Sequence, residues 1–136
     1  MAPALYLGDK HYIIPQIVHP DYLSTILHLC KAENIKGILS LIDPELSLLA
    51  GLEKEFYQAG VKAIVSPYEA CETFLDKFAA YLFFESNGFK CARTYQSINN
   101  FKIGLINKEV KFPVLIKPRK GSASLGVCTV NNLKTL

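Results

Sequence analysis

The feature that most constrains this chain is an alternation of helical and strand-like segments between residues 21 and 88. Apolar residues recur at helical spacing in the longer segments and form short unbroken runs in the segments between them. The expected order is helix, strand, helix, strand, helix, over residues 21–32, 37–42, 43–60, 61–65 and 73–87. Strands that alternate with helices predict a parallel sheet covered by helices, so the fold class is α/β with a partial Rossmann-like sheet.

Local signals set the limits of these segments. Asn34, Gly60 and Gly88 follow predicted helices, where such residues commonly close the last turn. Asp43 and Pro44 combine a capping side chain with proline at the first helical position, which predicts a helix start. Further expected features are an edge strand at residues 12–14 and a helical region that begins at 66 and breaks before 73.

After Gly88 the pattern changes and predicts an antiparallel α+β lobe. Two apolar segments, residues 112–117 and 126–130, flank a loop rich in glycine and serine, which is typical of a hairpin. We place a domain boundary near residue 72, which gives one domain over residues 1–72 and another over residues 73–136. The other expected elements of this lobe are a strand at 91–96, a helix at 97–105 and a helix start at 131–132.

Composition excludes several classes of protein. The net charge of +3 over 136 residues is small for a nucleic-acid-binding or membrane-surface protein. The sequence has no apolar run of the roughly 18 residues that a membrane helix needs, and no signal-peptide pattern, so we expect a cytoplasmic location. The four cysteines and three histidines are scattered, which argues against zinc and favours reduced, mostly buried thiols.

The segment from Phe112 to Val127 carries the clearest chemical signal. An apolar strand delivers Lys117 to the end of a sheet, and a loop of small residues follows. Backbone N–H groups in such a loop can approach an anion closely, and the cations of Lys117 and Arg119 suit phosphate oxygens. The pattern is not a Walker A loop, because GxxxxGK[ST] is absent and a strand follows it. The loop residues predicted to surround the phosphates are Gly121, Ser122, Ala123, Ser124 and Gly126.

Each candidate residue also has a structural interpretation. Lys117 could pack its stem at a strand end while its charge stays in water, and Arg119 with Lys120 could be a solvated pair of charges. Glu45 lies near the carboxyl end of a predicted strand, where ligands of open sheets bind, but it is equally a first-turn acid of a helix. The aromatic residues expected in the core around a helix are Tyr81, Phe83, Phe84 and Phe89.

Taken in order, these motifs resemble the carbamoyl-phosphate-synthase-like proteins of the ATP-grasp superfamily, over nearly the whole chain. Leu41-Ile-Asp-Pro-Glu45, Gly60-Val-Lys-Ala-Ile-Val-Ser66, Asp76-Lys77 and Thr94-Tyr95 precede the hairpin in the order of that family. The resemblance implies that residues 1–72 are an incomplete pre-ATP-grasp domain and residues 73–136 an incomplete N-terminal part of the ATP-grasp nucleotide-binding lobe.

The resemblance also implies roles for single residues. Lys117 would contact the phosphates of ATP, Lys77 would supply a second cation near them, and Gly121 to Gly126 would cover them. Asp76 and Lys77 are equally an ordinary pair at a helix N-terminus. The intact relatives use ATP and Mg²⁺ to form an acyl-phosphate from a carboxylate, which an amine or ammonia then attacks.

Parts of the family pattern have no counterpart in this sequence: the first strand–helix unit, the strands that hold adenine, and the acidic and Asn residues that bind Mg²⁺. We therefore expect a chain truncated at both ends that is not a competent catalyst alone. As an enzyme fragment it would bring the phosphate-binding loop to an ATP-dependent carboxylate-activating ligase, together with a second polypeptide.

Two other functions fit the same residues. A catalytically inactive ATP-grasp remnant could act as a dimerisation or interaction module through the apolar face of its lobe. A flavodoxin-like or Rossmann-type nucleotide binder is disfavoured, because no glycine turn follows an opening strand. The expected partners are a nucleotide and either a second copy or a second polypeptide, with no nucleic acid and no membrane.

Overall fold

The structure is a computed structural model that describes residues 6–136. They fall into two compact units. Unit 1 comprises residues 6–39 and 52–64, and unit 2 comprises Ser40–Gly51 and Val65–Leu136. The first five residues of the predicted first domain lie outside the described residues, and the domain boundary near residue 72 stays a prediction.

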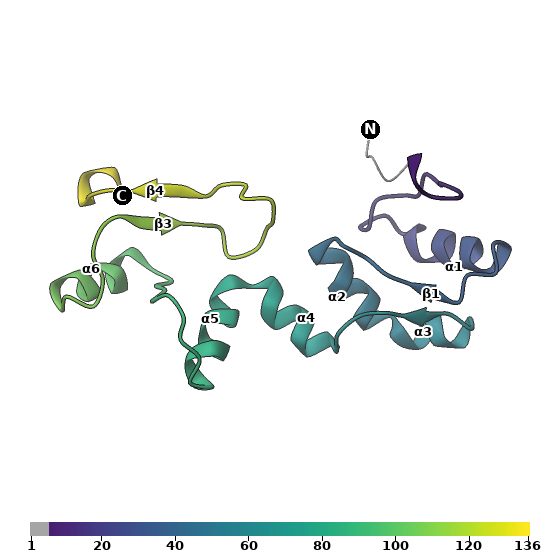
Figure 1. The fold of residues 1–136 in the computed structure, drawn as a ribbon, viewed down its shortest axis with the longest axis horizontal. Coiled ribbons are helices and arrows are strands. Elements are labelled where there is room, and N and C mark those ends of the chain that lie inside the picture. Colours follow the sequence, from purple (N-terminus) through teal and green to yellow (C-terminus); the bar gives the residue numbers. More distant parts are fainter. Residues whose placement is uncertain (1–5) are drawn as a thin grey trace. The chain divides into compact units, whose positions relative to one another are not determined.

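Unit 1 is a short parallel sheet with helices (Figure 1). The chain runs through α1 (Tyr22–Ala32), β1 (Gly37–Ile38), α3 (Glu53–Gln58) and β2 (Lys62–Ala63). β1 and β2 pair in parallel, with Gly37 opposite Lys62 and Ile38 opposite Ala63. Strands that each follow a helix and pair in parallel agree with the predicted α/β class and are compatible with a partial Rossmann-like sheet.

One face of α1 and the end of α3 supply the core of unit 1. The buried residues of α1 recur every four positions, which is the spacing of one helix face. Phe56 of α3 has no exposed surface, so it gives up the full area of its ring to the core. The buried apolar residues of this unit are Tyr22, Ile26, Cys30, Phe56, Val61 and Ala63.

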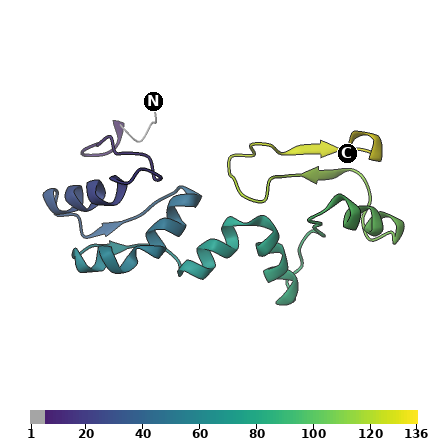
Figure 2. The same cartoon turned by 180° about the vertical axis from the view of Figure 1, so that it is seen from behind.

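Unit 2 combines helices with an antiparallel hairpin. α2 (Asp43–Gly51) packs on α4 (Tyr68–Leu75), and α4 packs on α5 (Lys77–Ser86). The remaining elements are α6 (Ile98–Ile106), β3 (Val114–Ile116), β4 (Cys128–Val130) and the 3-10 helix η2 (Leu133–Thr135). Figures 1 and 2 show β3 and β4 running side by side, joined at one end by a long loop, which confirms the predicted hairpin.

The helices α1, α3, α5 and α6 end in the same hydrogen-bond pattern, the Schellman motif. In α1, Ile35 N–H donates to the Cys30 carbonyl at 2.8 Å and Asn34 N–H to the Lys31 carbonyl at 3.3 Å. The residue that turns the chain has a positive φ in each case, and these residues are Asn34, Gly60, Gly88 and Lys108. The first three are the helix ends predicted from the sequence.

The predicted helix over residues 43–60 is wrong as a single element, because it breaks at Leu52 into α2 and α3. Gly51, which has poor helix propensity, ends α2. The two halves bury their apolar residues in different places, Leu49 in unit 2 and Phe56 in unit 1. Competing tertiary contacts therefore override the continuous helical pattern.

The break in the next helical region was predicted before residue 73 but lies at Asp76. Asp76 has an extended backbone (φ −99°, ψ 109°), and its carboxylate accepts hydrogen bonds from the N–H groups of Phe78 and Ala79. This is an N-cap, so the boundary between the two predicted helical segments moves to Asp76, between α4 and α5.

The predicted strands are too long, and two are absent among the described residues. β1 and β2 each keep only two residues, and β1 is not buried, since Gly37 is exposed and Ile38 half-buried. Residues 12–14 and 91–96 form no strand, because no neighbouring strand pairs with them. The helix predicted from Asn131-Asn132 is the 3-10 turn η2, which Asn132 caps.

The prediction of buried aromatic residues around α5 holds only for Tyr81. Phe83 and Phe89 are exposed and Phe84 is half-buried, although their rings contact one another at the surface, with centroids 5.9 Å apart in each adjacent pair. The thiols are all free, but they are not mostly buried. Cys30 is buried, Cys71 is half-buried, and Cys91 and Cys128 are exposed.

Candidate functional site

The hairpin of unit 2 presents Lys117 directly after β3. Its register pairs Val114 with Val130 and Ile116 with Cys128, so the last residue of β3 faces the first residue of β4. Lys117 is exposed, and its amino group makes no hydrogen bond or ion pair with residues 6–136. The strand therefore ends in a cation that is available to a ligand.

The loop that follows contains a strained reverse turn. Leu125 N–H donates to the Ser122 carbonyl at 3.2 Å, and the two residues between them have positive φ angles, 54° at Ala123 and 58° at Ser124. These are features of a type I′ turn. A residue with a Cβ in this conformation costs roughly 1–2 kcal/mol, so the turn is held at a cost that function commonly explains.

Backbone N–H groups of this loop lack acceptors. Only Leu125 and Val127 donate to other backbone atoms, to the carbonyls of Ser122 and Ser124. Exposed N–H dipoles in a tight loop form the kind of concave surface that binds anions. Among the candidate residues, those whose N–H groups find no acceptor within residues 6–136 are Gly121, Ser122, Ala123, Ser124 and Gly126.

Lys77 lies against this loop, although it is far away in sequence. It is the first residue of α5, and its backbone N–H donates to the Arg119 carbonyl at 2.9 Å. Its amino group donates to the Gly121 carbonyl at 2.5 Å. The structure therefore brings Lys77 and the predicted phosphate loop together.

Arg119 is paired with Asp76. Its Nε donates to Asp76 Oδ1 at 3.0 Å and its Nη2 donates to Asp76 Oδ2. The hydrogen bonds from Arg119, with those from the N–H groups of Phe78 and Ala79, lower the pKa of the Asp76 carboxyl from 3.8 to about 2. Arg119 was predicted either as a cation for phosphate oxygens or as part of a solvated pair with Lys120, whereas the structure gives it a carboxylate partner.

Two other charged residues considered as candidates, Lys120 and Glu45, make contacts of their own. Lys120 lies 3.9 Å from a carboxylate oxygen of Glu72, and both side chains are substantially exposed, so this contact is weak. Glu45, the other candidate, accepts a hydrogen bond from the buried hydroxyl of Ser40, which in turn accepts from Ile42 N–H at 3.0 Å. Glu45 thus helps to fix the first turn of α2.

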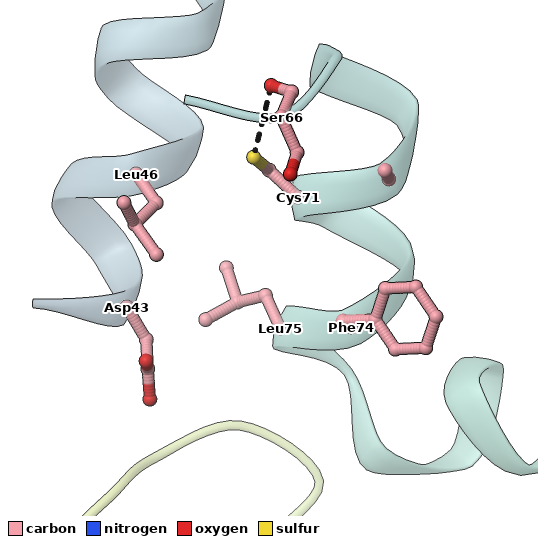
Figure 3. Close-up of a pocket in the computed structure, with 7 residues that line it drawn as sticks. Asp43, Leu46, Ser66, Cys71, Phe74 and Leu75 are labelled. Atoms are coloured by element: carbon pink, nitrogen blue, oxygen red, sulfur yellow. Dashed lines mark hydrogen bonds between the residues drawn. The ribbon is translucent and has the colours of Figure 1, made fainter. Parts of the chain in front are cut away.

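An apolar cavity of about 210 Å³ lies between α2 and α4, within unit 2. Figure 3 shows Leu46 and Leu75 reaching into it from the two helices, and the Cys71 thiol donating to the Ser66 carbonyl at 3.4 Å. Asp43 and Leu46 are neighbours of the candidate Glu45 in the chain, but no candidate site residue itself lines the cavity. Its lining is Asp43, Leu46, Ser66, Ala70, Cys71, Phe74 and Leu75.

Sequence reasoning missed the pairing of Asp76 with Arg119. The available signal was an acidic residue in the capping position before Lys77, but its partner lies 43 residues further on. The structure brings Lys77, Arg119 and Gly121 together and leaves Lys117 free at the end of β3. Contact of these residues with a nucleotide stays a prediction.

Residues 6–136 contain no group of three or more His, Cys, Asp or Glu side chains that could hold a metal ion. No helix in this part of the chain is long and apolar enough to cross a bilayer.

Comparison with known proteins supports the first half of the resemblance. Residues 1–64 match the family model for the PylC-like, N-terminal domain. The chain is also 25% identical over 122 residues to the Multifunctional protein ura1 of Schizosaccharomyces pombe, an alignment that covers 88% of this chain. The chain spans about 5% of the length of that curated relative. These matches agree with a region that precedes the nucleotide-binding lobe of ATP-grasp proteins, whereas the finer resemblance to carbamoyl-phosphate synthase stays a prediction.

Proposed function

We propose that this chain contributes the phosphate-binding hairpin of an ATP-dependent, carboxylate-activating ligase of the ATP-grasp type, similar to the large chain of carbamoyl-phosphate synthase. The observation that carries this proposal is the loop after β3: it follows Lys117 in the chain, contains N–H groups without acceptors, and contacts Lys77. The PylC-like match over residues 1–64 supports the family assignment, since such a domain adjoins a nucleotide-binding lobe in the proposed group.

The loop suits a triphosphate by charge and by geometry. A hydrogen bond from a charged donor contributes about 1.5–3 kcal/mol, and the hairpin offers the exposed Lys117 together with several N–H groups that have no acceptor. Gly121 and Gly126, with φ angles of 123° and 70°, let the backbone approach a ligand without a side chain in the way. In this proposal the hairpin binds and covers phosphates and excludes water from them.

In a complete enzyme of this group, Mg²⁺ would neutralise charge on the transferred phosphate. The described residues offer no donor set for it, so we assign no chemical step to the metal in this chain. The proposal therefore includes a second polypeptide, or further residues, that would supply the metal ligands and the acceptor site.

Binding of a fluorescent N-methylanthraniloyl derivative of ATP tests this function. The chain lacks tryptophan, so the probe signal is free of interference from protein fluorescence at long wavelength. We expect saturable binding that ATP displaces better than AMP, because AMP lacks the β- and γ-phosphates.

Two substitutions make that experiment specific. Lys117→Ala should weaken binding by about tenfold or more, the loss of one charged hydrogen bond. Lys111→Ala, which removes an exposed lysine just before β3, is the matched control and should have little effect. Equal losses in both variants would indicate unspecific attraction, and no saturable binding by the unchanged chain would exclude the proposed function.

An interaction module without turnover is the second candidate. The observation in its favour is the exposed apolar surface of the hairpin, where Leu115 is 66% and Leu125 76% exposed. Sedimentation velocity at several concentrations should then show self-association that Leu115→Asp reduces. A monomer at all concentrations would exclude self-association by this surface.

A further inference from the structure

The guanidinium of Arg119 is already engaged by two other side chains of the protein. Two of its N–H donors form a fork on the Asp76 carboxylate, one of them at 3.0 Å. Its guanidinium also lies over the Phe78 ring, with Cζ 5.7 Å from the ring centroid. Contacts on an edge and on a face together fix the orientation of the guanidinium.

Asp76 is already held by α5. Its Oδ1 accepts from the Phe78 N–H at 2.9 Å and from the Ala79 N–H at 3.3 Å, and only 14% of its side chain is exposed, against 50% for Arg119. The Asp76 carboxylate is therefore held in place by its own helix, and the more exposed Arg119 side chain binds to it. Because Arg119 lies in the loop, the ion pair attaches the loop to the N-terminus of α5.

The ion pair between Asp76 and Arg119 also holds the loop against Lys77. The backbone N–H of Lys77 reaches the Arg119 carbonyl, and its amino group reaches the Gly121 carbonyl, two residues further along the loop. A lysine at this position can contact an anion on the loop only while the loop stays at α5. The pair of Asp76 and Arg119 thus controls where Lys77 lies relative to the N–H groups.

We propose that Asp76 and Arg119 form a positioning pair: the carboxylate anchors Arg119, and with it the loop, on α5, so that Lys77 and the loop N–H groups face the same phosphates. The part of this inference that concerns phosphates rests on the proposed function, whereas the anchoring of the loop does not. Arg119 is then a residue that acts through the loop and not a phosphate ligand.

Amide hydrogen exchange tests the anchoring without any nucleotide. The Lys77 N–H is the first of a helix and has no acceptor within α5, so the Arg119 carbonyl is what protects it. Arg119→Gln should speed its exchange roughly tenfold, on the order of 1.4 kcal/mol, whereas the Phe78 and Ala79 amides, capped by Asp76, should keep their rates. Asp76→Asn should also expose Lys77, because asparagine can still cap the helix but carries no charge for Arg119.

A matched control and a conservative variant complete the exchange experiment. Lys120→Gln removes the neighbouring cation of the loop, whose contact with Glu72 is weak, and should leave Lys77 exchange unchanged. Arg119→Lys keeps the charge but not the two-donor fork, so it should behave as Arg119→Gln does. Unchanged Lys77 exchange in the Asp76 and Arg119 variants would overturn the anchoring.

ATP binding distinguishes the two possible roles of Arg119, because they predict opposite effects of Asp76→Asn on the affinity for ATP. If the pair positions the loop, Asp76→Asn and Arg119→Lys both weaken binding by roughly fivefold or more, the low end of coupling between separate groups. If Arg119 were a phosphate ligand, Asp76→Asn would free it and tighten binding, and Arg119→Lys would retain affinity. That outcome overturns the proposal. Should the unchanged chain bind no ATP, the proposed function fails, and the exchange result decides the anchoring alone.

Discussion

The two sheets of this protein are held by different means. The parallel pair of unit 1 is only two residues long, and an apolar cluster around the fully buried Phe56 holds it. The hairpin of unit 2 is longer, but Val130 is its only buried strand residue, and its loop is tied to α5 by Asp76, Lys77 and Arg119. Hydrophobic burial thus stabilises one sheet, whereas directional polar contacts fix the loop of the other.

Phe56→Ala should break unit 1 with the largest effect. Removing a buried phenylalanine ring costs about 3–5 kcal/mol, because a cavity is left in the core. Tyr57→Ala, its neighbour on α3 with 80% exposure, should change the free energy of unfolding by no more than about 0.5 kcal/mol. Denaturant unfolding followed by circular dichroism measures both. Equal losses would contradict a core centred on Phe56.

Gly104→Ala tests the corresponding small core of unit 2. A Cβ at this buried position of α6 would lie 2.1 Å from the Tyr95 hydroxyl oxygen, and that ring packs on Phe101. Displacing the ring should cost about 1–3 kcal/mol, despite the better helix propensity of alanine. Gly51→Ala on α2 meets only ordinary contacts at 3.7 Å and should not destabilise. Thermal unfolding compares the pair, and a stable Gly104→Ala variant would contradict the packing of Tyr95.

Gly126→Ala and Gly60→Ala compare a loop of each unit. Both glycines have a positive φ, 70° and 75°, so alanine costs about 1 kcal/mol or more at either position. At Gly126 the Cβ would also meet Pro118 Cγ at 3.0 Å, whereas nothing lies within 4 Å at Gly60. We expect the larger loss at Gly126, measured by denaturant unfolding. A larger loss at Gly60 would show that the loop rearranges freely.

Lys108→Gly should stabilise the protein slightly. Lys108 ends α6 with a φ of 60°, the position that glycine occupies at the end of α3. Relief of that strain outweighs the added freedom of the unfolded chain by about 0.5 kcal/mol. Lys102→Gly, within α6, should instead destabilise by about 1 kcal/mol. Calorimetric midpoints distinguish the two, and destabilisation by both would contradict the capping role.

Acid should weaken the attachment of the hairpin loop and leave the apolar core of unit 1 in place. The folded pKa of Asp76 is about 2, below the ordinary 3.8, so its contribution is complete above that ordinary value and is lost as the pH falls toward 2. Carbon-13 NMR of the Asp76 carboxyl should give a midpoint near 2. A midpoint at the ordinary value would show that Arg119 does not hold the carboxylate in solution.

The helix ends could be predicted because their causes are local. Asn34, Gly60 and Gly88 close their Schellman motifs with neighbouring carbonyls, and Ser97 caps α6 through the Asn100 N–H. The lengths of the strands could not be predicted, since a strand exists only where another pairs with it. The split at Leu52 could not be predicted either, because the two halves of the predicted helix pack into the cores of different units.

The candidate residues could be named from the sequence, but their arrangement could not. The sequence indicates the loop and Lys117 because small residues after a strand that ends in a cation suit an anion, and their contact with a nucleotide stays a prediction. The contacts of Lys77 with Gly121 and of Arg119 with Asp76 join residues 44 and 43 positions apart, and no local pattern indicates them. The pairing of Arg119 with Asp76 therefore could not be predicted from the sequence.

The attachment of the hairpin to α5 also determines where this chain can tolerate changes in length. Residues 90–92, in the connection from α5 to α6, have neither helix nor strand and are exposed. Since each doubling of a loop costs only about 0.6 kcal/mol, extra residues inserted here would lengthen the connection without moving the hairpin. The segment is thus a natural place to introduce a tag or a spectroscopic probe while the hairpin loop keeps its place on the helix.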